Sequence, residues 1–213
     1  MGVALLAEQT APVRVGPMDP AVLLTVADLH LAAYADYTHT RLGKRYVVSF
    51  LGWFLQDPEG IALVASDSGR LAGYVVGAPL GYRVRLTRAT LPAAVAGALR
   101  RPWIVLDRRI RRIAWVRIQE AIRAWRGEPG TGAANSITYS LVSIAVAPEA
   151  RGRQLSRVLM EAFEAEARGR GARRLCLSVH ANNAPARSLY EKAGWTLACH
   201  SGEDTLCYSK TLQ

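Results

Sequence analysis

The stretch LVSIAVAPEARGRQLSRVLM, residues 141–160, decides the fold of this chain. It opens with an apolar, β-branched run that predicts a strand ending before Pro148. A basic turn over residues 151–156 follows, and the apolar spacing after it predicts a helix over about Leu155–Arg168. The first backbone N–H groups of a helix lack internal partners, and the helix dipole favours negative charge there. The stretch therefore predicts a phosphate-binding turn between a strand and a helix.

A second pattern lies downstream, where the chain reads NAPARSLYEKAGW over residues 183–195. Together with the turn, it resembles the GNAT superfamily of acetyl-CoA-dependent N-acetyltransferases. In that family the turn follows Q/R-x-x-G-x-G/A, and the second signature is N-x-x-A-x-x-L-Y-x-K-x-G-F/W. The second signature matches at every specified position, and Arg151 fills the first position of the turn. Gln154 and Ser156 stand where the two glycines are usual. The resemblance covers roughly residues 11–79 and 137–212.

The resemblance implies an α/β fold with a mostly antiparallel central sheet, flanking helices and two parallel strands that splay apart. It implies that the turn binds the pyrophosphate of acetyl-CoA, with the guanidinium of Arg151 or Arg153 beside it. The pantetheine arm would pair with the main chain of the first splayed strand, at Ile144 and Val146. The implied cofactor-binding residues are Ile144, Ala145, Val146, Arg151, Gly152, Arg153, Gln154, Leu155, Ser156, Asn183 and Tyr190.

Two residues are expected to carry the proton transfers. By resemblance, Tyr190 would protonate the coenzyme A thiolate as it leaves, since a phenol with an ordinary pKa of about 10 is a suitable donor. The general base is open, because the predicted strand over residues 137–146 contains no acidic side chain. His180, at a strand end, leads the candidates. The others are Tyr139, Asp36, His39 and a chain of water molecules.

Each of these residues also has a structural interpretation. The turn is otherwise a solvated basic loop, and Tyr190 a core or capping tyrosine. Asn183 otherwise caps a loop, and His180 is a structural histidine at the end of its strand. The side chains of Ile144 and Val146 are core residues under either interpretation.

Composition indicates one globular domain of 213 residues with 50% hydrophobic and 21% charged residues. No apolar run reaches the roughly 18 residues of a membrane span, and residues 1–10 do not resemble a signal peptide. The three cysteines have no metal-ligand spacing and favour a reducing, cytoplasmic environment. We expect no metal site.

Periodicity predicts the remaining elements. The expected strands and helices are a strand at 13–15, helices at 19–35 and 42–55, a hairpin at 61–65 and 71–76, a strand at 137–146, a strand at 174–179, a helix from 185 to about 194, and a hairpin at 195–199 and 205–210.

An Arg-rich insertion over about residues 81–136 interrupts this layout. Between residues 81 and 128, twelve arginines face three acidic residues, a surplus of nine positive charges in a chain of net charge +10. We expect a short helix near Pro92–Arg100 and a long amphipathic helix near Trp103–Trp125. The insertion could form a wall of the acceptor site for an acidic or phosphate-bearing substrate, or a homodimer surface. Membrane contact or nonspecific nucleic-acid binding is the third alternative.

The expected activity is transfer of an acetyl group from acetyl-CoA to an amine of a small-molecule acceptor. The stretches LGKR at residues 42–45 and DPEGIALVA at residues 57–65 also resemble bacterial family members associated with glycan or natural-product biosynthesis, which suggests an amino sugar or a natural-product intermediate. Two alternatives stay open: transfer to a hydroxyl or a different amine, and a non-catalytic module that binds acyl-CoA and regulates another process.

Overall fold

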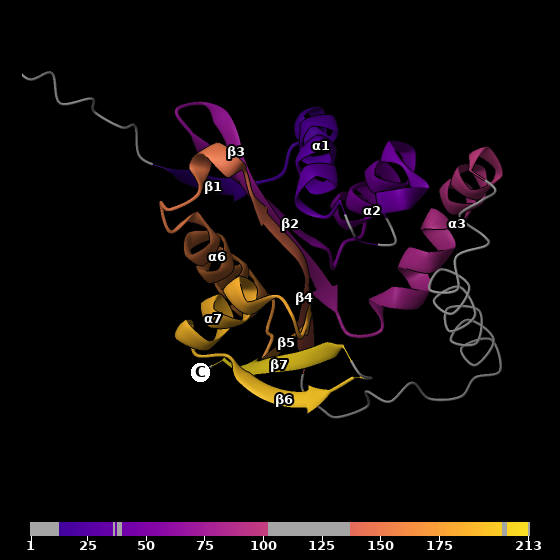
Figure 1. Cartoon of the computed structure of the whole chain (residues 1–213). Coiled ribbons are helices and arrows are strands. Elements are labelled where there is room, and N and C mark those ends of the chain that lie inside the picture. The colour runs from indigo at the N-terminus through magenta and orange to yellow at the C-terminus, as the bar shows by residue number, and fades with distance from the viewer. Residues whose placement is uncertain (1–12, 36, 38–39, 102–136, 202–203, 213) are drawn as a thin grey trace, which may run out of the picture.

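A seven-stranded sheet forms the centre of the molecule (Figure 1). The structure is a computed structural model that describes residues 13–35, 37, 40–101, 137–201 and 204–212. The strands lie in the order β1-β2-β3-β4-β5-β7-β6, and only β4 and β5 pair in parallel. This arrangement confirms the expected α/β fold. The strand bounds are β1 (Arg14–Pro17), β2 (Ile61–Asp67), β3 (Arg70–Pro79), β4 (Thr138–Val146), β5 (Arg174–His180), β6 (Thr196–His200) and β7 (Thr205–Thr211).

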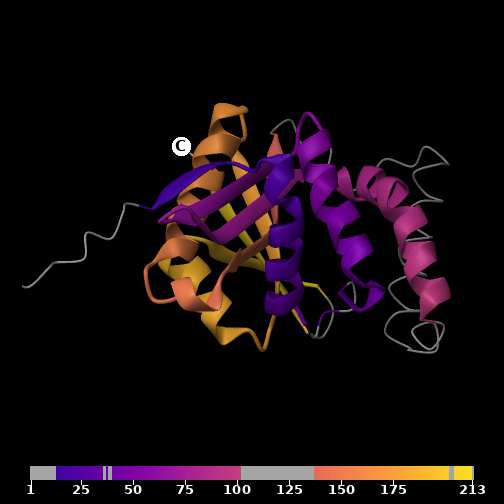
Figure 2. The same ribbon diagram turned by 90° about the horizontal axis from the view of Figure 1, so that it is seen from above.

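Helices cover both faces of the sheet, and Figure 2 shows the layers from above. One face carries α1 (Leu23–Ala33) and α2 (Lys44–Gln56), with α3 (Tyr82–Arg100) packed on α2. The other face carries α6 (Leu155–Gly169) and α7 (Ala184–Lys192). Each predicted helix and strand outside the insertion is present, with ends shifted by a few residues. Helix boundaries are the part of a sequence prediction that varies most, because terminal turns fray or tighten.

The short helix predicted near Pro92–Arg100 is wrong in its start, because α3 begins ten residues earlier, after Gly81. Proline is favoured in a first helical turn, which would suit a helix that begins at Pro92. In the structure Pro92 lies in the helix interior, and the buried side chains of Tyr82 and Leu86 anchor the earlier turns against the α2 side. The long helix expected near Trp103–Trp125 lies outside the described residues, and the extent of the insertion stays a prediction.

A β-bulge in β4 changes which face its side chains occupy. Leu141 pairs with Gly77 and Ser143 pairs with Val76, so Val142 is an extra residue opposite β3. An extra residue reverses the alternation of side chains beyond it. Leu141 therefore packs on the α6 side, whereas Ser143 and Ala145 face α1. Parallel pairing of β4 with β5 also ends here, at Leu141 and Leu177.

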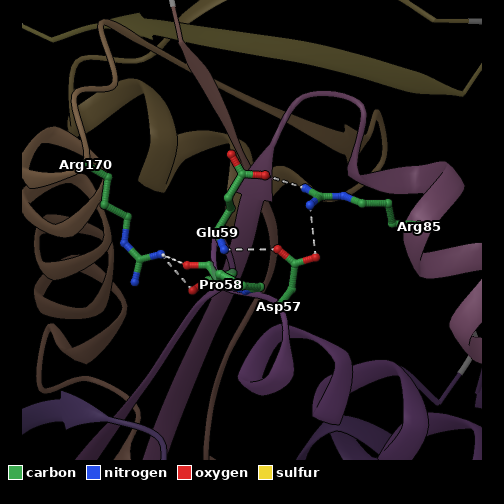
Figure 3. Close-up of polar contacts among 6 residues, drawn as sticks. Asp57, Pro58, Glu59, Arg85 and Arg170 are labelled. Carbon is green, nitrogen blue, oxygen red and sulfur yellow. Dashed lines mark hydrogen bonds and ion pairs between the residues drawn. The ribbon is translucent and has the colours of Figure 1, made fainter.

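Two arginines from opposite sides hold the turn between α2 and β2 (Figure 3). Arg85 of α3 forms ion pairs with Asp57 at 3.2 Å and with Glu59 at 2.8 Å. Arg170, just after α6, donates to the carbonyl oxygens of Pro58 and Gly60 at 3.2 and 3.0 Å. The turn thus joins the α3 layer to the α6 layer across the end of the sheet. One of the arginines of the predicted insertion is therefore structural.

A buried carboxylate connects α6 to the C-terminal hairpin. Glu164 accepts a hydrogen bond from Trp195 Nε1 at 2.9 Å and from Lys210 Nζ at 2.6 Å. Lys210 also donates to the carbonyl oxygen of Ala193 at 2.8 Å. Trp195 closes the downstream signature, so these contacts fix α7 and its loop relative to α6.

Replacing Glu164 with alanine should lower the free energy of unfolding by about 3 kcal/mol, because it leaves the buried Trp195 Nε1 without an acceptor and Lys210 without its carboxylate partner. Chemical denaturation measures the loss. Glu161→Ala is the matched control on the same helix, since Glu161 forms an exposed pair with Arg157 and should cost no more than about 0.5 kcal/mol. Equal losses in the two variants would contradict the structural role of Glu164.

Candidate active site

The basic turn between β4 and α6 adopts the conformation expected of an anion-binding loop. Gly152 and Gln154 both have positive φ, at 81° and 57°, and α6 begins at Leu155 directly after them. The side chain of Leu155 is buried, which anchors the first turn of the helix to the body of the protein. The N–H groups of this first turn lack intrahelical acceptors and point outward from a fixed position. The turn therefore presents a rigid donor surface to an anion.

A pocket of about 530 Å³ opens in front of this turn. Its size falls in the range of small-molecule sites. Three cationic residues line its wall: Arg151 from the turn, Arg157 from α6 and Lys192 from α7. The remaining wall is mainly apolar or main chain, and Val146 at the end of β4 connects it with the sheet. The lining residues are Val146, Ala150, Arg151, Gly152, Gln154, Leu155, Ser156, Arg157, Leu189, Lys192 and Ala193.

Arg153 points away from this pocket. Its guanidinium forms an ion pair with Asp67, at the tip of the hairpin between β2 and β3. Of the two arginines considered for the pyrophosphate, the structure places Arg151 at the pocket and ties Arg153 to the sheet. Lys192 was missed as a pocket cation, although it fills the lysine position of the downstream signature. Its place one helical turn beyond Leu189, another lining residue, was the available signal.

Gln154 occupies a backbone conformation that favours glycine, at φ 57° and ψ 16°. A non-glycine residue in this region costs roughly 1–2 kcal/mol. Ser156, the other departure from the family pattern, lies inside α6 and carries no such strain. The strain is thus confined to one position of the turn.

We expect Gln154→Gly to raise the free energy of unfolding by up to about 1 kcal/mol, after the extra flexibility of glycine in the unfolded chain is subtracted. Gln154→Val should lower it, because a β-branched side chain is least tolerated at positive φ. Thermal unfolding of the two variants measures both changes. A loss of stability in Gln154→Gly would contradict the strain.

The splayed strands expose main-chain groups of β4. Along β4, the main-chain N–H and C=O groups of successive residues point alternately toward β3 and toward β5. The N–H of Ala147 donates to the carbonyl oxygen of Ala72 of β3 at 2.8 Å, which fixes this alternation. The main-chain groups of Ile144 and Val146 therefore face the gap toward β5, whereas those of Ala145 face β3. Ile144 and Val146, the two residues implied for pantetheine binding, are therefore placed for it, whereas Ala145, also among the implied cofactor-binding residues, faces β3.

A tyrosine from α1 contacts the first of these groups. The hydroxyl of Tyr34 donates to the carbonyl oxygen of Ile144 at 2.7 Å and lies 3.3 Å from the Ile144 nitrogen. Tyr34 could not be identified from the sequence, because 110 residues separate it from Ile144. Its side chain is half-buried, so it forms part of the wall of the gap.

Tyr190 lies in the same region and is buried. Its ring packs 6.2 Å from Trp195 and 6.1 Å from Tyr208, measured between ring centroids. Burial raises the pKa of Tyr190 well above its ordinary value, and interaction with Tyr34 and Tyr37 adds to the rise. The expectation of an ordinary phenol pKa is therefore wrong. Tyr190 therefore keeps its proton at neutral pH.

His180 and Asn183 frame the end of β5. The exposed ring of His180 packs edge-on against Tyr37, with centroids 5.0 Å apart. Asn183 caps α7, because its Oδ1 accepts a hydrogen bond from the N–H of Ala186 at 3.2 Å. Tyr37 also hydrogen-bonds to Asn183, and burial raises the pKa of Tyr37. The connection after α1 thus reaches the loop before α7.

The other candidates for the general base lie in the core or outside the described residues. Tyr139 is buried in the apolar cluster on the α6 side of the sheet, among core residues such as Leu175. Asp36 and His39 lie outside the described residues. His180 is consequently the one sequence-derived candidate that the described structure places near Tyr37 and the splayed strands.

A buried polar chain runs behind the gap. His30 Nδ1 lies 2.5 Å from the hydroxyl of Tyr74, and that hydroxyl lies 2.8 Å from Ser143 Oγ. Ser143 also hydrogen-bonds to Tyr34. No short motif could have revealed this chain, because its members come from α1, β3 and β4, and the Val142 bulge determines the side on which Ser143 lies.

Comparison with protein families identifies the class. The model of the acetyltransferase (GNAT) family matches residues 25–195. This chain therefore belongs to the GNAT acetyltransferase family, whose members use acetyl-CoA as the acyl donor. The earlier resemblance is confirmed. Among curated proteins, no sequence matches this chain.

Solved structures share the fold at low sequence identity. The ribosomal-protein-S18-alanine N-acetyltransferase from Escherichia coli is 16% identical, with a TM-score of 0.57 and 94% of each chain covered. The PaiA N-acetyltransferase from Thermoplasma acidophilum, solved in complex with coenzyme A, is 13% identical, with a TM-score of 0.58, and the match covers 95% of this chain and 100% of that one. An acetyltransferase from Thermus thermophilus is 16% identical, with a TM-score of 0.57, over 95% and 99% of the two chains.

None of the helices among the described residues is long and apolar enough to cross a membrane. In the same part of the chain, no group of three or more histidine, cysteine or acidic side chains is arranged to hold a metal ion.

Proposed function

We propose that this protein transfers the acetyl group of acetyl-CoA to an amine of a small molecule. One observation carries the proposal: Val146, whose main chain faces the gap between the splayed strands, also lines the pocket before α6. A diphosphate in the pocket would thus be joined to an arm that reaches the tyrosines of the gap. Bound acetyl-CoA supplies an acyl group activated as a thioester.

The residues of the pocket would bind the diphosphate. The N–H groups around Gly152 and Ser156, with the charges of Arg151 and Lys192, are suited to several phosphate oxygens. The main chain of Ile144 and Val146 would bind the pantetheine arm as an added strand binds a sheet edge. Tyr34 now bonds to Ile144, so it would have to share or give up that contact.

Tyr190 would stabilise the leaving sulfur. Because its raised pKa keeps it protonated, its hydroxyl would donate a hydrogen bond to the sulfur and pass its proton to the departing thiolate. Asn183 would hold the loop in front of α7, and His180 would face the open side of the gap. Direct attack of the amine on the acyl carbon in a ternary complex needs no covalent enzyme intermediate.

For the acceptor, we propose only a chemical class. The arginines of the insertion favour an acidic or phosphate-bearing amine, such as an amino sugar or a natural-product intermediate. A homodimer surface is the second role proposed for the insertion, ahead of membrane contact, and we propose no specific nucleic-acid partner. The described cysteines are free, and a cytoplasmic location fits this.

A non-catalytic acyl-CoA-binding module is the second candidate, because β4 lacks an acidic residue and the turn contains the strained Gln154. Transfer to a hydroxyl or a different amine is the enzymatic alternative. Release of free thiol from acetyl-CoA with a panel of amines and alcohols separates these activities. Labelled acetyl-CoA in a metabolite extract, followed by mass spectrometry, then identifies the acceptor. Coenzyme A binding without thiol release in any assay would favour the module.

A further inference from the structure

The proposed transfer leaves one proton without a destination. An amine acceptor is protonated near neutral pH, and an ammonium nitrogen has no lone pair with which to attack a thioester. Strand β4 contains no carboxylate to receive the proton. A general base or a hydrogen-bonded path must therefore come from another element.

The buried polar chain behind the gap provides such a path. Its inner end is His30, which is 1% exposed, and its outer end is the half-buried Tyr34. Between them stand the hydroxyls of Tyr74 and Ser143, with separations of 2.5 and 2.8 Å along the inner two links. Ser143 completes the connection, because it lies near enough to the Tyr34 hydroxyl to lower the pKa of that phenol through hydrogen bonding. Every member is a group that can both donate and accept a proton.

The outer end of the path lies where the reaction would take place. The Tyr34 hydroxyl contacts Ile144, whose main chain faces the gap between β4 and β5. Tyr34 packs edge-on against Tyr37, with ring centroids 5.0 Å apart, and it is near enough to Tyr190 to contribute to the raised pKa of that phenol. A substrate amine positioned beside Tyr190 would therefore meet Tyr34 at the same wall.

We propose, building on the function above, that the chain Tyr34–Ser143–Tyr74–His30 accepts the proton of the acceptor ammonium and stores it on His30. The ammonium N–H bond breaks as its proton moves to the Tyr34 oxygen, and the electron pair stays on nitrogen. Because the pantetheine arm replaces Tyr34 at the Ile144 carbonyl, the Tyr34 hydroxyl turns to Ser143 and its proton moves there, the Ser143 proton moves to Tyr74, and the Tyr74 proton moves to His30 Nδ1. After product release, the same steps in reverse deliver the proton to water.

The surroundings of each residue in the chain suit proton transfer along it. The ring of His30 packs against Tyr34 on its own helix, Phe50 of α2 and Tyr74 of β3, with centroids 4.8, 5.6 and 6.0 Å away. Burial raises the pKa of Tyr34 and of Tyr74. Both phenols are therefore neutral at physiological pH, and they transfer protons without becoming stable phenolates. Tyr37 and Tyr190 are the titratable groups that face Tyr34 from the loop after α1 and from α7.

The central test is Tyr74→Phe, because Tyr74 is fully buried and does not touch the gap. It interrupts the path and leaves the aromatic ring in place. Thiol release from acetyl-CoA should fall about 10²-fold with amines that are protonated at the assay pH. Raising the pH toward the amine pKa should restore most of the rate, because the amine then arrives neutral. Ser143→Ala should show the same pattern if Tyr74→Phe folds poorly.

Tyr82→Phe is the matched control. Tyr82 is a buried tyrosine in the same apolar cluster, and it packs on Trp53 and Phe54 away from the chain. Its rate should stay within about twofold of the wild type at every pH, well short of the effect of losing a proton-transfer group. Wild-type rates at every pH in both Tyr74→Phe and Ser143→Ala would overturn the proposal. A loss that high pH does not reduce would show a purely structural role and would also overturn it.

Nitrogen NMR of histidine-labelled protein gives a readout independent of activity. The path requires a neutral His30 whose Nδ1 accepts a hydrogen bond at neutral pH, and the Nδ1 resonance should move in Tyr74→Phe. A doubly protonated His30 in the resting protein would overturn the proposal. If the wild type neither binds coenzyme A nor releases thiol, the proposed function fails instead. The two failures are therefore distinguishable.

Discussion

Replacing Tyr190 with phenylalanine should lower kcat about 10²-fold and change the KM for acetyl-CoA by no more than about twofold. The substitution removes one hydroxyl from a buried ring and leaves its packing against Trp195 and Tyr208 intact. In the proposed reaction that hydroxyl contacts sulfur only as the thiolate leaves. The loss should therefore appear in the chemical step, and steady-state kinetics of thiol release measures it.

The matched control is Tyr208→Phe in the same aromatic cluster. The Tyr208 hydroxyl donates to Glu191 Oε1 at 2.6 Å, so its removal should cost about 1–2 kcal/mol of stability and leave kcat nearly unchanged. Because burial raises the pKa of Tyr190, its ionisation should cause no fall in kcat up to about pH 10. A Tyr190→Phe enzyme with wild-type kcat would remove this residue from the mechanism.

Replacing Ser156 with aspartate should weaken coenzyme A binding about 100-fold. Ser156 lies in the first turn of α6 and lines the pocket. A carboxylate roughly 5 Å from a phosphate charge costs about 3 kcal/mol at an effective dielectric constant of 20, which is a hundredfold or more in affinity. The same carboxylate at a helix N-terminus is favourable for the fold. Affinity should therefore fall while thermal stability stays equal or rises.

Ser156→Asn separates charge from size. Asparagine has nearly the shape of aspartate and no charge, so most of the affinity should remain in calorimetric titrations with coenzyme A. Equal losses in the two variants would indicate steric exclusion rather than repulsion of an anion. Unchanged affinity in Ser156→Asp would place the diphosphate elsewhere.

The order of strands and helices could be predicted from the sequence because its signals are local. The apolar run before Pro148 and the basic turn marked β4 and the start of α6, and both elements are present in the structure. The start of α3 could not be predicted in the same way. Burial of Tyr82 and Leu86 outweighs the preference of Pro92 for a first helical turn.

The same distinction between local and long-range signals applies to the residues of the candidate site. The turn residues and Tyr190 belong to compact motifs, so their neighbourhood could be predicted from spacing alone. Tyr34 and His30 could not be found, because their partners lie 110 and 44 residues away, at Ile144 and Tyr74. The bulge at Val142 is also invisible in the sequence, since it depends on the register between β3 and β4.

The location of the diphosphate can be measured by hydrogen–deuterium exchange with and without coenzyme A. Amides around residues 151–158 in the turn and the first part of α6 should become protected, together with those of residues 142–146 in β4, while those of β6 and β7 should not change. No protection at the turn at saturating coenzyme A, or protection confined to other elements, would contradict an anion-binding site at the start of α6.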